Sequence, residues 1–196
     1  MASFSDYNHQ WSYYLAIESQ LENTSRYVEF TQSNSLTYSI EFARILLSAA
    51  SETDVVLKEF CKILNPTANA DKEPQYRKVV QDHYPGMIDE VIHMTRFSID
   101  LQPWSNWGSD NKTPDWWTAN NKVKHHRNTD FAKANLKNAM HAVGALHILL
   151  VHYYKRLFSI TNGSEISFSD TTSALIPEAK LFTMNDDYYN HFLIVG

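Results

Sequence analysis

Two long runs of apolar residues at helical spacing constrain the fold of this chain more than any other feature of its sequence. In the first run, over 36–64, steps of four and three residues place these side chains on one helix face: Leu36, Ile40, Ala43, Leu47, Ala50, Asp54, Leu57, Cys61 and Leu64. The opposite stripe is mostly polar, so the run predicts a long amphipathic helix. Its start is expected within 33–35, and Asn65-Pro66 ends it, because a residue before proline disfavours helical geometry.

The second run, over 129–158, predicts another long helix, with Asn128 or Thr129 as its cap. Small residues at 142, 144 and 145 should let a further helix approach it closely. A shorter helix is expected over about 7–28, and Thr113-Pro114-Asp115 is a favourable start for a helix of about three turns, with Thr113 as its cap. The segment 87–101 is ambiguous between helix and strand.

These elements predict an all-α fold, a helical bundle of about five helices over 1–163. Residues 164–196 are expected to form an extended C-terminal arm that packs on the bundle or on a partner. The apolar tail Phe192 to Val195 would have to be covered, which favours a homodimer.

Charge and cysteine content exclude several classes of function. The net charge of −5 gives nucleic acid or an anionic membrane no general attraction, so any anion site must be a local patch. A single cysteine, Cys61, excludes an internal disulfide framework and favours the cytoplasm. The most apolar stretch, 142–157, is too short to span a membrane and is interrupted by His147 and His152.

No metal site and no cofactor are expected. His141, His147 and His152 are six and five residues apart, which does not place pairs of them on one helix face, so they are expected at or near the surface. The chain contains no phosphate-cradling glycine loop, dinucleotide fingerprint or GxSxG elbow. Tryptophans at 104, 107, 116 and 117 can stack nucleobases, but so close together they are expected to fill a core.

Asp54 interrupts the apolar stripe of the first long helix, with Glu52 two residues away. An ionised acid in a core needs a cation or several donors opposite it. Asp54 is therefore expected to contact the segment 120–127 or the start of the second long helix. It is either a structural acid paired with a neighbouring helix or, with Glu52, a supporting acid that orients a functional group.

A cationic segment follows in an otherwise acidic chain: Asn120, Asn121, Lys122, Lys124, His125, His126 and Arg127. From 120 to 137 there are five Lys or Arg and one acid. Asn121, Lys124 and His125 share one helix face, and they combine amide donors, a positive charge and a group that titrates near neutral pH. That set suits an RNA phosphodiester. The alternative is a solvated basic segment favoured by the helix dipole.

The order LLSAASETDVVLKEF, PWSNW, WWTANNKVKHHR and FAKANLKNAMHAVGALHILL resembles the HEPN superfamily of all-helical domains, over about 36–158. That superfamily includes many RNases of toxin, CRISPR and phage-defence systems. Its motif is an arginine, often a following polar residue, and a histidine a few residues on, brought together across a dimer. Asn121 and His125 match the polar residue and the histidine, whereas Asn120 stands at the arginine position.

The resemblance implies a metal-independent endoribonuclease or a degenerate RNA-binding relative, in a defence or toxin system. His125 would then move the proton, Lys124 would hold the scissile phosphate and Asn121 would orient its oxygens. Asn120, Lys122, His126 and Arg127 would bind RNA, and no DNA specificity is expected. The alternative is a non-catalytic protein-interaction module.

Overall fold

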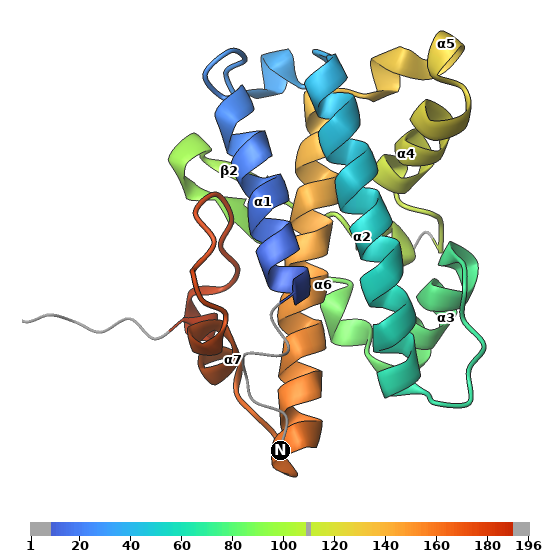
Figure 1. Cartoon of the computed structure of the whole chain (residues 1–196), viewed down its shortest axis with the longest axis vertical. Helices are drawn as coiled ribbons and strands as arrows, with labels where there is room; N and C mark the ends of the chain where they lie inside the picture. The colour runs from blue at the N-terminus through green and yellow to red at the C-terminus, as the bar shows by residue number, and fades with distance from the viewer. Residues whose placement is uncertain (1–8, 109–110, 190–196) are drawn as a thin grey trace, which may run out of the picture.

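The computed structural model describes residues 9–108 and 111–189, and this part of the chain is mostly helical (Figure 1). Its α-helices are α1 (His9–Thr24), α2 (Ile40–Leu64), α3 (Glu73–His83), α4 (Asp115–His125), α5 (Arg127–Asp130), α6 (Leu136–Asn162) and α7 (Phe168–Ala174). The strands are β1 (Ile92–Met94) and β2 (Ile99–Leu101). The described residues thus hold seven α-helices, where the sequence predicts about five, because α5 and α7 are short additions of four and seven residues.

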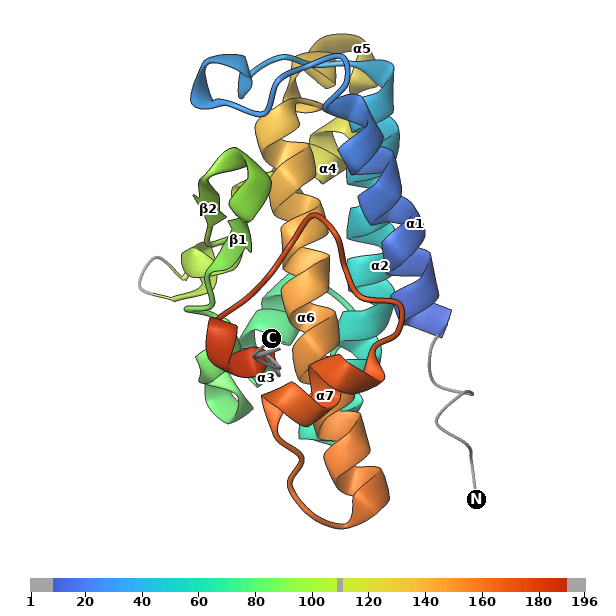
Figure 2. The ribbon, with the colours of Figure 1, turned by 90° about the vertical axis from the view of Figure 1, so that its left-hand side faces the viewer.

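Helix α6 is the axis of the molecule. Its central turns are buried on every side, as expected of a helix that is apolar all round. Helices α1, α2 and α4 pack on it, α3 packs on α2, and α7 packs on the lower part of α6 (Figures 1 and 2). None of the helices in the described residues is long and apolar enough to cross a membrane.

Helix α2 begins later than the sequence predicts. Its cap is Ser39, whose side chain accepts a hydrogen bond from the Phe42 N–H, and Leu36 and Ile40 are 72% and 69% exposed. The buried face includes Phe42, Ile45, Leu46, Ala49, Thr53, Val56 and Phe60. Because α2 contacts α1, α3, α4 and α6, it buries a wide face, and the predicted stripe lies along one edge of it.

Helix α6 also begins later than predicted. The side chain of Asn135 caps it by accepting from the Asn138 N–H at 3.0 Å, so Asn128 and Thr129 are not its cap. Backbone hydrogen bonds hold this start beside the segment that precedes α2, with the Leu136 N–H 2.9 Å from the Thr37 carbonyl. The intervening residues form α5 and a 3-10 turn, so the predicted continuous helix is split.

The ambiguous segment 87–101 contains an antiparallel hairpin rather than a helix. Ile92 pairs with Leu101 and Met94 with Ile99, and Ser98 in the turn has a positive φ of 53°. The hairpin approaches α6 at Gly144, where an added Cβ would lie 3.1 Å from Cγ2 of Ile92. At Gly144, the absence of a side chain thus allows the hairpin, rather than a further helix, to approach α6 closely.

The tryptophans fill the core, as the sequence predicts. Trp104, Trp107 and Trp116 are fully buried, and Trp117 nearly so. Each of the first three donates its indole N–H to an oxygen of the protein: Ala145 O, Glu73 Oε1 and Pro103 O. Buried rings with satisfied donors have no face left for a nucleobase.

The described part of the C-terminal arm, 164–189, packs on the bundle and is partly helical rather than extended throughout. It buries Leu175, Leu181, Phe182 and Met184, and it crosses α6 on the face seen in Figure 2. Thr183 forms a two-way backbone bridge with His93 of the hairpin, with N···O distances of 2.7 and 2.9 Å. The tail Phe192 to Val195, which motivates the predicted dimer, lies outside the described residues.

Candidate functional site

The cationic segment lies on the outer side of α4 and in the turn that follows it. Burial of Trp116, Trp117, Ala119 and Val123 fixes how α4 is rotated, and it leaves Asn121, Lys122, Lys124 and His125 exposed. Thr113 does not cap this helix as predicted, because its hydroxyl donates to Glu73 Oε2 at 2.8 Å. The rotation of α4 therefore decides which of these polar groups face α2.

A hollow of about 440 Å³ lies between α2 and α4; we call it the α2–α4 hollow. Its lining from α2 is Leu47, Ala50, Ser51 and Asp54, and from α4 it is Trp117, Asn120, Asn121 and Lys124. It thus brings together four residues that the sequence singled out: one acid, two amides and one lysine. The Asn120 amide N–H donates to the Asn121 side-chain oxygen at 3.4 Å.

Asp54 is partnered within the bundle. One oxygen is 2.5 Å from Lys58 Nζ on the same helix, and the other accepts the Tyr76 hydroxyl of α3 at 3.1 Å. Its side chain is 33% exposed. Burial and the Asp54 carboxylate raise the pKa of Tyr76, so this hydroxyl stays protonated. Asp54 thus shares a hollow with the segment 120–127, as part of the prediction requires, but among the described residues no hydrogen bond or ion pair joins them.

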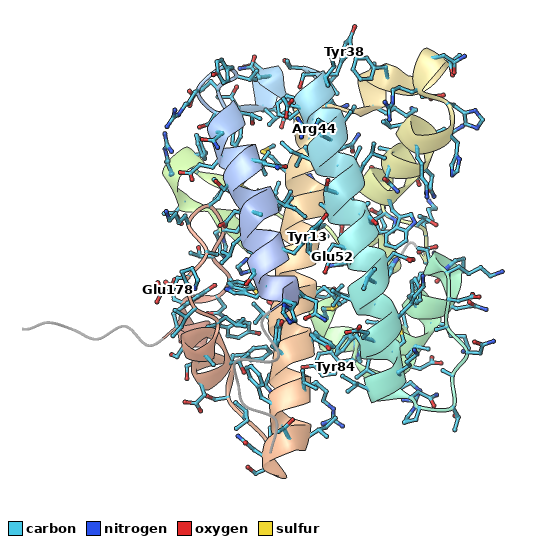
Figure 3. All side chains as sticks on the ribbon, in the orientation of Figure 1. Tyr13, Tyr38, Arg44, Glu52, Tyr84 and Glu178 are labelled. Atoms are coloured by element: carbon cyan, nitrogen blue, oxygen red, sulfur yellow. The ribbon has the colours of Figure 1, made fainter. Side chains whose placement is uncertain are left out.

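Glu52 does not support this site. Two residues along a helix correspond to about 200° of rotation, so Glu52 lies on the side of α2 that faces α1 (Figure 3). It lies on the same face as Glu59, which accepts a hydrogen bond from Gln10 of α1. Burial and the Glu59 charge raise the pKa of Glu52. Glu52 is therefore not part of the lining that Asp54 shares with α4.

His125 is the last residue of α4, exposed, and outside the lining of the α2–α4 hollow. Its ring lies edge-on to that of His126, with centroids 6.5 Å apart. His126 joins α4 to α5, because its N–H donates to Lys122 and its carbonyl accepts the Asp130 N–H. The structure thus gathers Asn120, Asn121 and Lys124 in the lining of the hollow, whereas Lys122, His125 and His126 are not part of that lining.

A second hollow, of about 600 Å³, continues along α2 toward its start; we call it the α2–α5 hollow. It is lined by Ile40, Ala43, Arg44, Leu47, Arg127, Asn128 and Phe131. Leu47 lines both hollows, so they are adjacent, and we call the pair the α2/α4–α5 groove. Figure 3 labels Arg44, which lines the α2–α5 hollow, and Tyr38, whose ring lies edge-on to that of Phe131.

The groove has an excess of positive charge that nothing in the described chain neutralises. Two cations of its lining, Lys124 and Arg127, form no ion pair among the described residues, whereas Arg44 pairs with Glu41 at 3.1 Å. The one acid in the lining, Asp54, is paired with Lys58. Such a groove can hold an anion through one or two cations and several amide donors.

The sequence missed part of the α2–α5 hollow, including Arg44 and Phe131, because these residues are far apart along the chain and lie together only in the folded protein. It also misplaced two histidines, since His147 and His152 are buried in α6 rather than near the surface. Within residues 9–108 and 111–189 no three His, Cys, Asp or Glu side chains cluster to hold a metal ion. Comparisons with protein-family models, with curated proteins and with solved structures gave no match.

Proposed function

We propose that the chain is a HEPN-like RNA-binding protein whose α2/α4–α5 groove holds the phosphates of single-stranded RNA. The observation that carries the proposal is the grouping of Asn120, Asn121 and Lys124 around one hollow, with Arg127 in the next hollow along. Lysine supplies a point charge, arginine binds two phosphate oxygens at once, and asparagine donates directed hydrogen bonds. The two hollows are adjacent, so they suit successive groups along one strand.

The acidic balance of the whole chain limits this binding to a short contact. With a net charge of −5, long-range attraction is absent and only the local cations act on the RNA. Asp54 does not oppose a phosphate strongly, because Lys58 lies 2.5 Å from it. Trp104, Trp107 and Trp116 are fully buried and cannot stack a base, so recognition is assigned to the phosphates.

Within this proposal, cleavage depends on His125. Attack of the ribose 2′-hydroxyl on the adjacent phosphate needs one proton removed and one delivered, while the growing negative charge is offset. Lys124 and Asn121 are assigned to the phosphate and His125 to one proton. The HEPN resemblance assigns the second proton-transfer group to a second copy of the chain.

Binding is tested by fluorescence anisotropy of a labelled single-stranded RNA at low and moderate salt. Lys124→Glu should weaken binding about tenfold and lower the slope of log K against log salt by about one. The matched control is Lys180→Glu, which reverses the charge of an exposed lysine on the arm, away from the groove. Absence of binding by the unmodified protein at low salt, or equal effects of the two variants, would refute the proposal.

A second candidate function, a protein-interaction module, is favoured by the apolar side chains at the outer end of the groove. Leu36, Tyr38 and Ile40 are largely exposed beside the α2–α5 hollow, and Phe131 lies edge-on to Tyr38. Contiguous exposed apolar residues mark interfaces. A homodimer through this face would dissociate in sedimentation runs of Ile40→Asp, while Ile160→Asp, an exposed site on α6, would leave it intact.

A further inference from the structure

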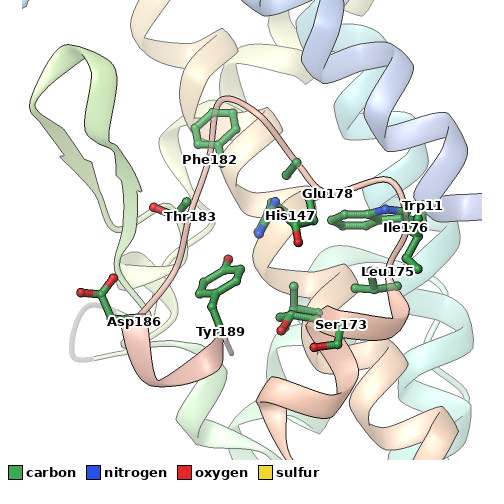
Figure 4. A pocket seen from close by; sticks show the side chains of 13 residues that line it. Trp11, His147, Ser173, Leu175, Ile176, Glu178, Phe182, Thr183, Asp186 and Tyr189 are labelled. Atoms are coloured by element: carbon green, nitrogen blue, oxygen red, sulfur yellow. The ribbon is translucent and has the colours of Figure 1, made fainter. Parts of the chain in front are cut away.

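A pocket of about 560 Å³ lies under the C-terminal arm, and we call it the arm pocket. It shares no lining residue with the α2/α4–α5 groove. Its lining comes from α1, α6, α7 and the arm itself. In Figure 4 the arm arches over α6, and His147 lies beneath the arch between Phe182 and Leu175. The volume falls within the range of small-molecule sites.

His147 lines this pocket, and one nitrogen of its ring has no hydrogen-bond partner. The side chain is 1% exposed, and its Nε2 is the one buried side-chain nitrogen or oxygen of the described residues without a hydrogen-bond partner. Leaving such a group unpaired costs about 1–3 kcal/mol, so its presence beside a pocket points to a ligand that supplies the missing partner.

A chain of hydrogen bonds fixes which partner that nitrogen needs. Glu18 accepts from the backbone N–H groups of residues 180–182 and from the Tyr14 hydroxyl at 2.8 Å. The Tyr14 hydroxyl has one hydrogen, and it donates this hydrogen to Glu18. In the second bond, where His147 Nδ1 lies 2.8 Å from the Tyr14 oxygen, His147 must therefore be the donor. Nδ1 then carries the ring hydrogen, which leaves Nε2 a lone pair and makes it an acceptor.

Burial keeps the ring in this neutral form. Desolvation lowers the pKa of His147 to about 3, so at neutral pH the imidazole is uncharged and Nε2 can only accept. Trp11 is fixed at the pocket wall, because its indole N–H donates to the Pro177 carbonyl at 2.9 Å. The acceptor is thus held in a preorganised apolar setting.

The other lining residues indicate the polarity and the charge of a ligand that would fit the arm pocket. Trp11, Val151, Leu175 and Phe182 supply apolar walls. The charged members of the described lining are the acids Glu178 and Asp186, with no Lys or Arg. A ligand anion would meet like charge there, whereas a neutral or cationic ligand would not.

We propose that the arm pocket binds a small, apolar, neutral or cationic molecule that donates one N–H or O–H hydrogen bond to His147 Nε2. Indole is a suitable probe, because it is flat, apolar and carries a single N–H. 1-Methylindole is its matched control, since it keeps the ring and lacks the donor. Tryptamine and indole-3-acetate add a positive and a negative charge to the same ring.

Isothermal titration calorimetry on the full chain tests the hydrogen bond. Indole should bind at least about tenfold more tightly than 1-methylindole, and His147→Phe should abolish that difference. Equal affinity for the two probes, or no heat from either at about 1 mM, would overturn the proposal.

The rim gives an independent test that does not alter the core. Glu178 is exposed, so Glu178→Lys should fold normally, weaken tryptamine and strengthen indole-3-acetate by several-fold each. Asp187→Lys makes the same charge change on an exposed residue of the same arm that does not line the pocket, and it should leave both affinities unchanged. An unchanged ratio of tryptamine to indole-3-acetate affinity in Glu178→Lys would overturn the proposal even if His147→Phe failed to fold.

Discussion

The indole N–H of Trp107 donates a 2.8 Å hydrogen bond to Glu73 Oε1. This bond joins the segment between β2 and α4 to the first turn of α3. The other oxygen of Glu73 accepts the Thr113 hydroxyl, just before α4, and Arg77 lies 3.8 Å from the carboxylate. One buried acid therefore holds three segments together, and through Thr113 it fixes where the helix of the candidate site begins.

Glu73→Ala should lower the free energy of unfolding by about 3 kcal/mol, because it strands two buried donors and a mostly buried arginine. Urea denaturation measures this loss. The matched control is Asp82→Ala on the same helix, whose pair with Lys78 is half exposed and should contribute little. Equal losses in the two variants would show that Glu73 has no special role.

Asp54→Asn should cost about 1 kcal/mol, because Asp54 is one-third exposed and its pair with Lys58 is screened by water. The same variant should tighten RNA binding only slightly, by about twofold, because Lys58 already offsets the charge of this acid in the α2–α4 hollow. Urea melts and RNA anisotropy check both effects. A loss above about 3 kcal/mol would instead indicate a buried, uncompensated partner.

His125→Ala should abolish cleavage of single-stranded RNA in EDTA and leave the fold intact, because the residue is exposed at the end of α4. RNA binding should fall less than cleavage, since Lys124 and Arg127 supply most of the phosphate attraction. His83→Ala, an exposed histidine at the end of α3, is the control. Cleavage that persists in His125→Ala would remove this histidine from the mechanism.

Lowering the pH should reduce the free energy of unfolding, because His147 is buried in its neutral form. Its folded pKa of about 3 lies below the unfolded value near 6.5, so the unfolded chain binds the extra proton and stability falls as the pH drops below 6.5. The loss between pH 7 and pH 5 should be about 2 kcal/mol from this residue. His152, whose pKa burial lowers against the opposing effect of Glu90, adds to the same trend.

Urea melts at pH 5, 6 and 7 measure that slope. His147→Gln should make it shallower, because glutamine does not titrate and its amide can still donate to Tyr14. An unchanged slope in His147→Gln would mean that the imidazole is protonated in the folded state.

The sequence predicts the mostly helical fold, the end of α2 before Pro66 and the buried tryptophans, because each depends on local spacing or local chemistry. It does not predict the start of α2, since Leu36 and Ile40 continue the apolar stripe into a segment that solvent surrounds. The sequence also does not predict the hairpin at 92–101, because each strand has only three residues, too few to show the alternation of apolar and polar side chains that indicates a strand.

The sequence likewise predicts part of the candidate site and leaves another part undetermined. Helical spacing places Asn121 and Lys124 on one face, and the structure adds Asp54 to the same hollow. Whether His125 lines that hollow depends on the rotation of α4, which burial of Trp116, Trp117 and Val123 decides. The tautomer of His147 depends on Glu18 and Tyr14, more than a hundred residues away, and no local pattern reports it.

The three N–H groups of 180–182 that bind Glu18 are separated from it by more than 160 residues. Contacts of such separation carry a large loop-closure entropy and form late in folding. During synthesis the carboxylate of Glu18 lacks these donors until residues 180–182 have left the ribosome. A chain that stops at the end of α6 would therefore lack the donors that make the buried acid tolerable.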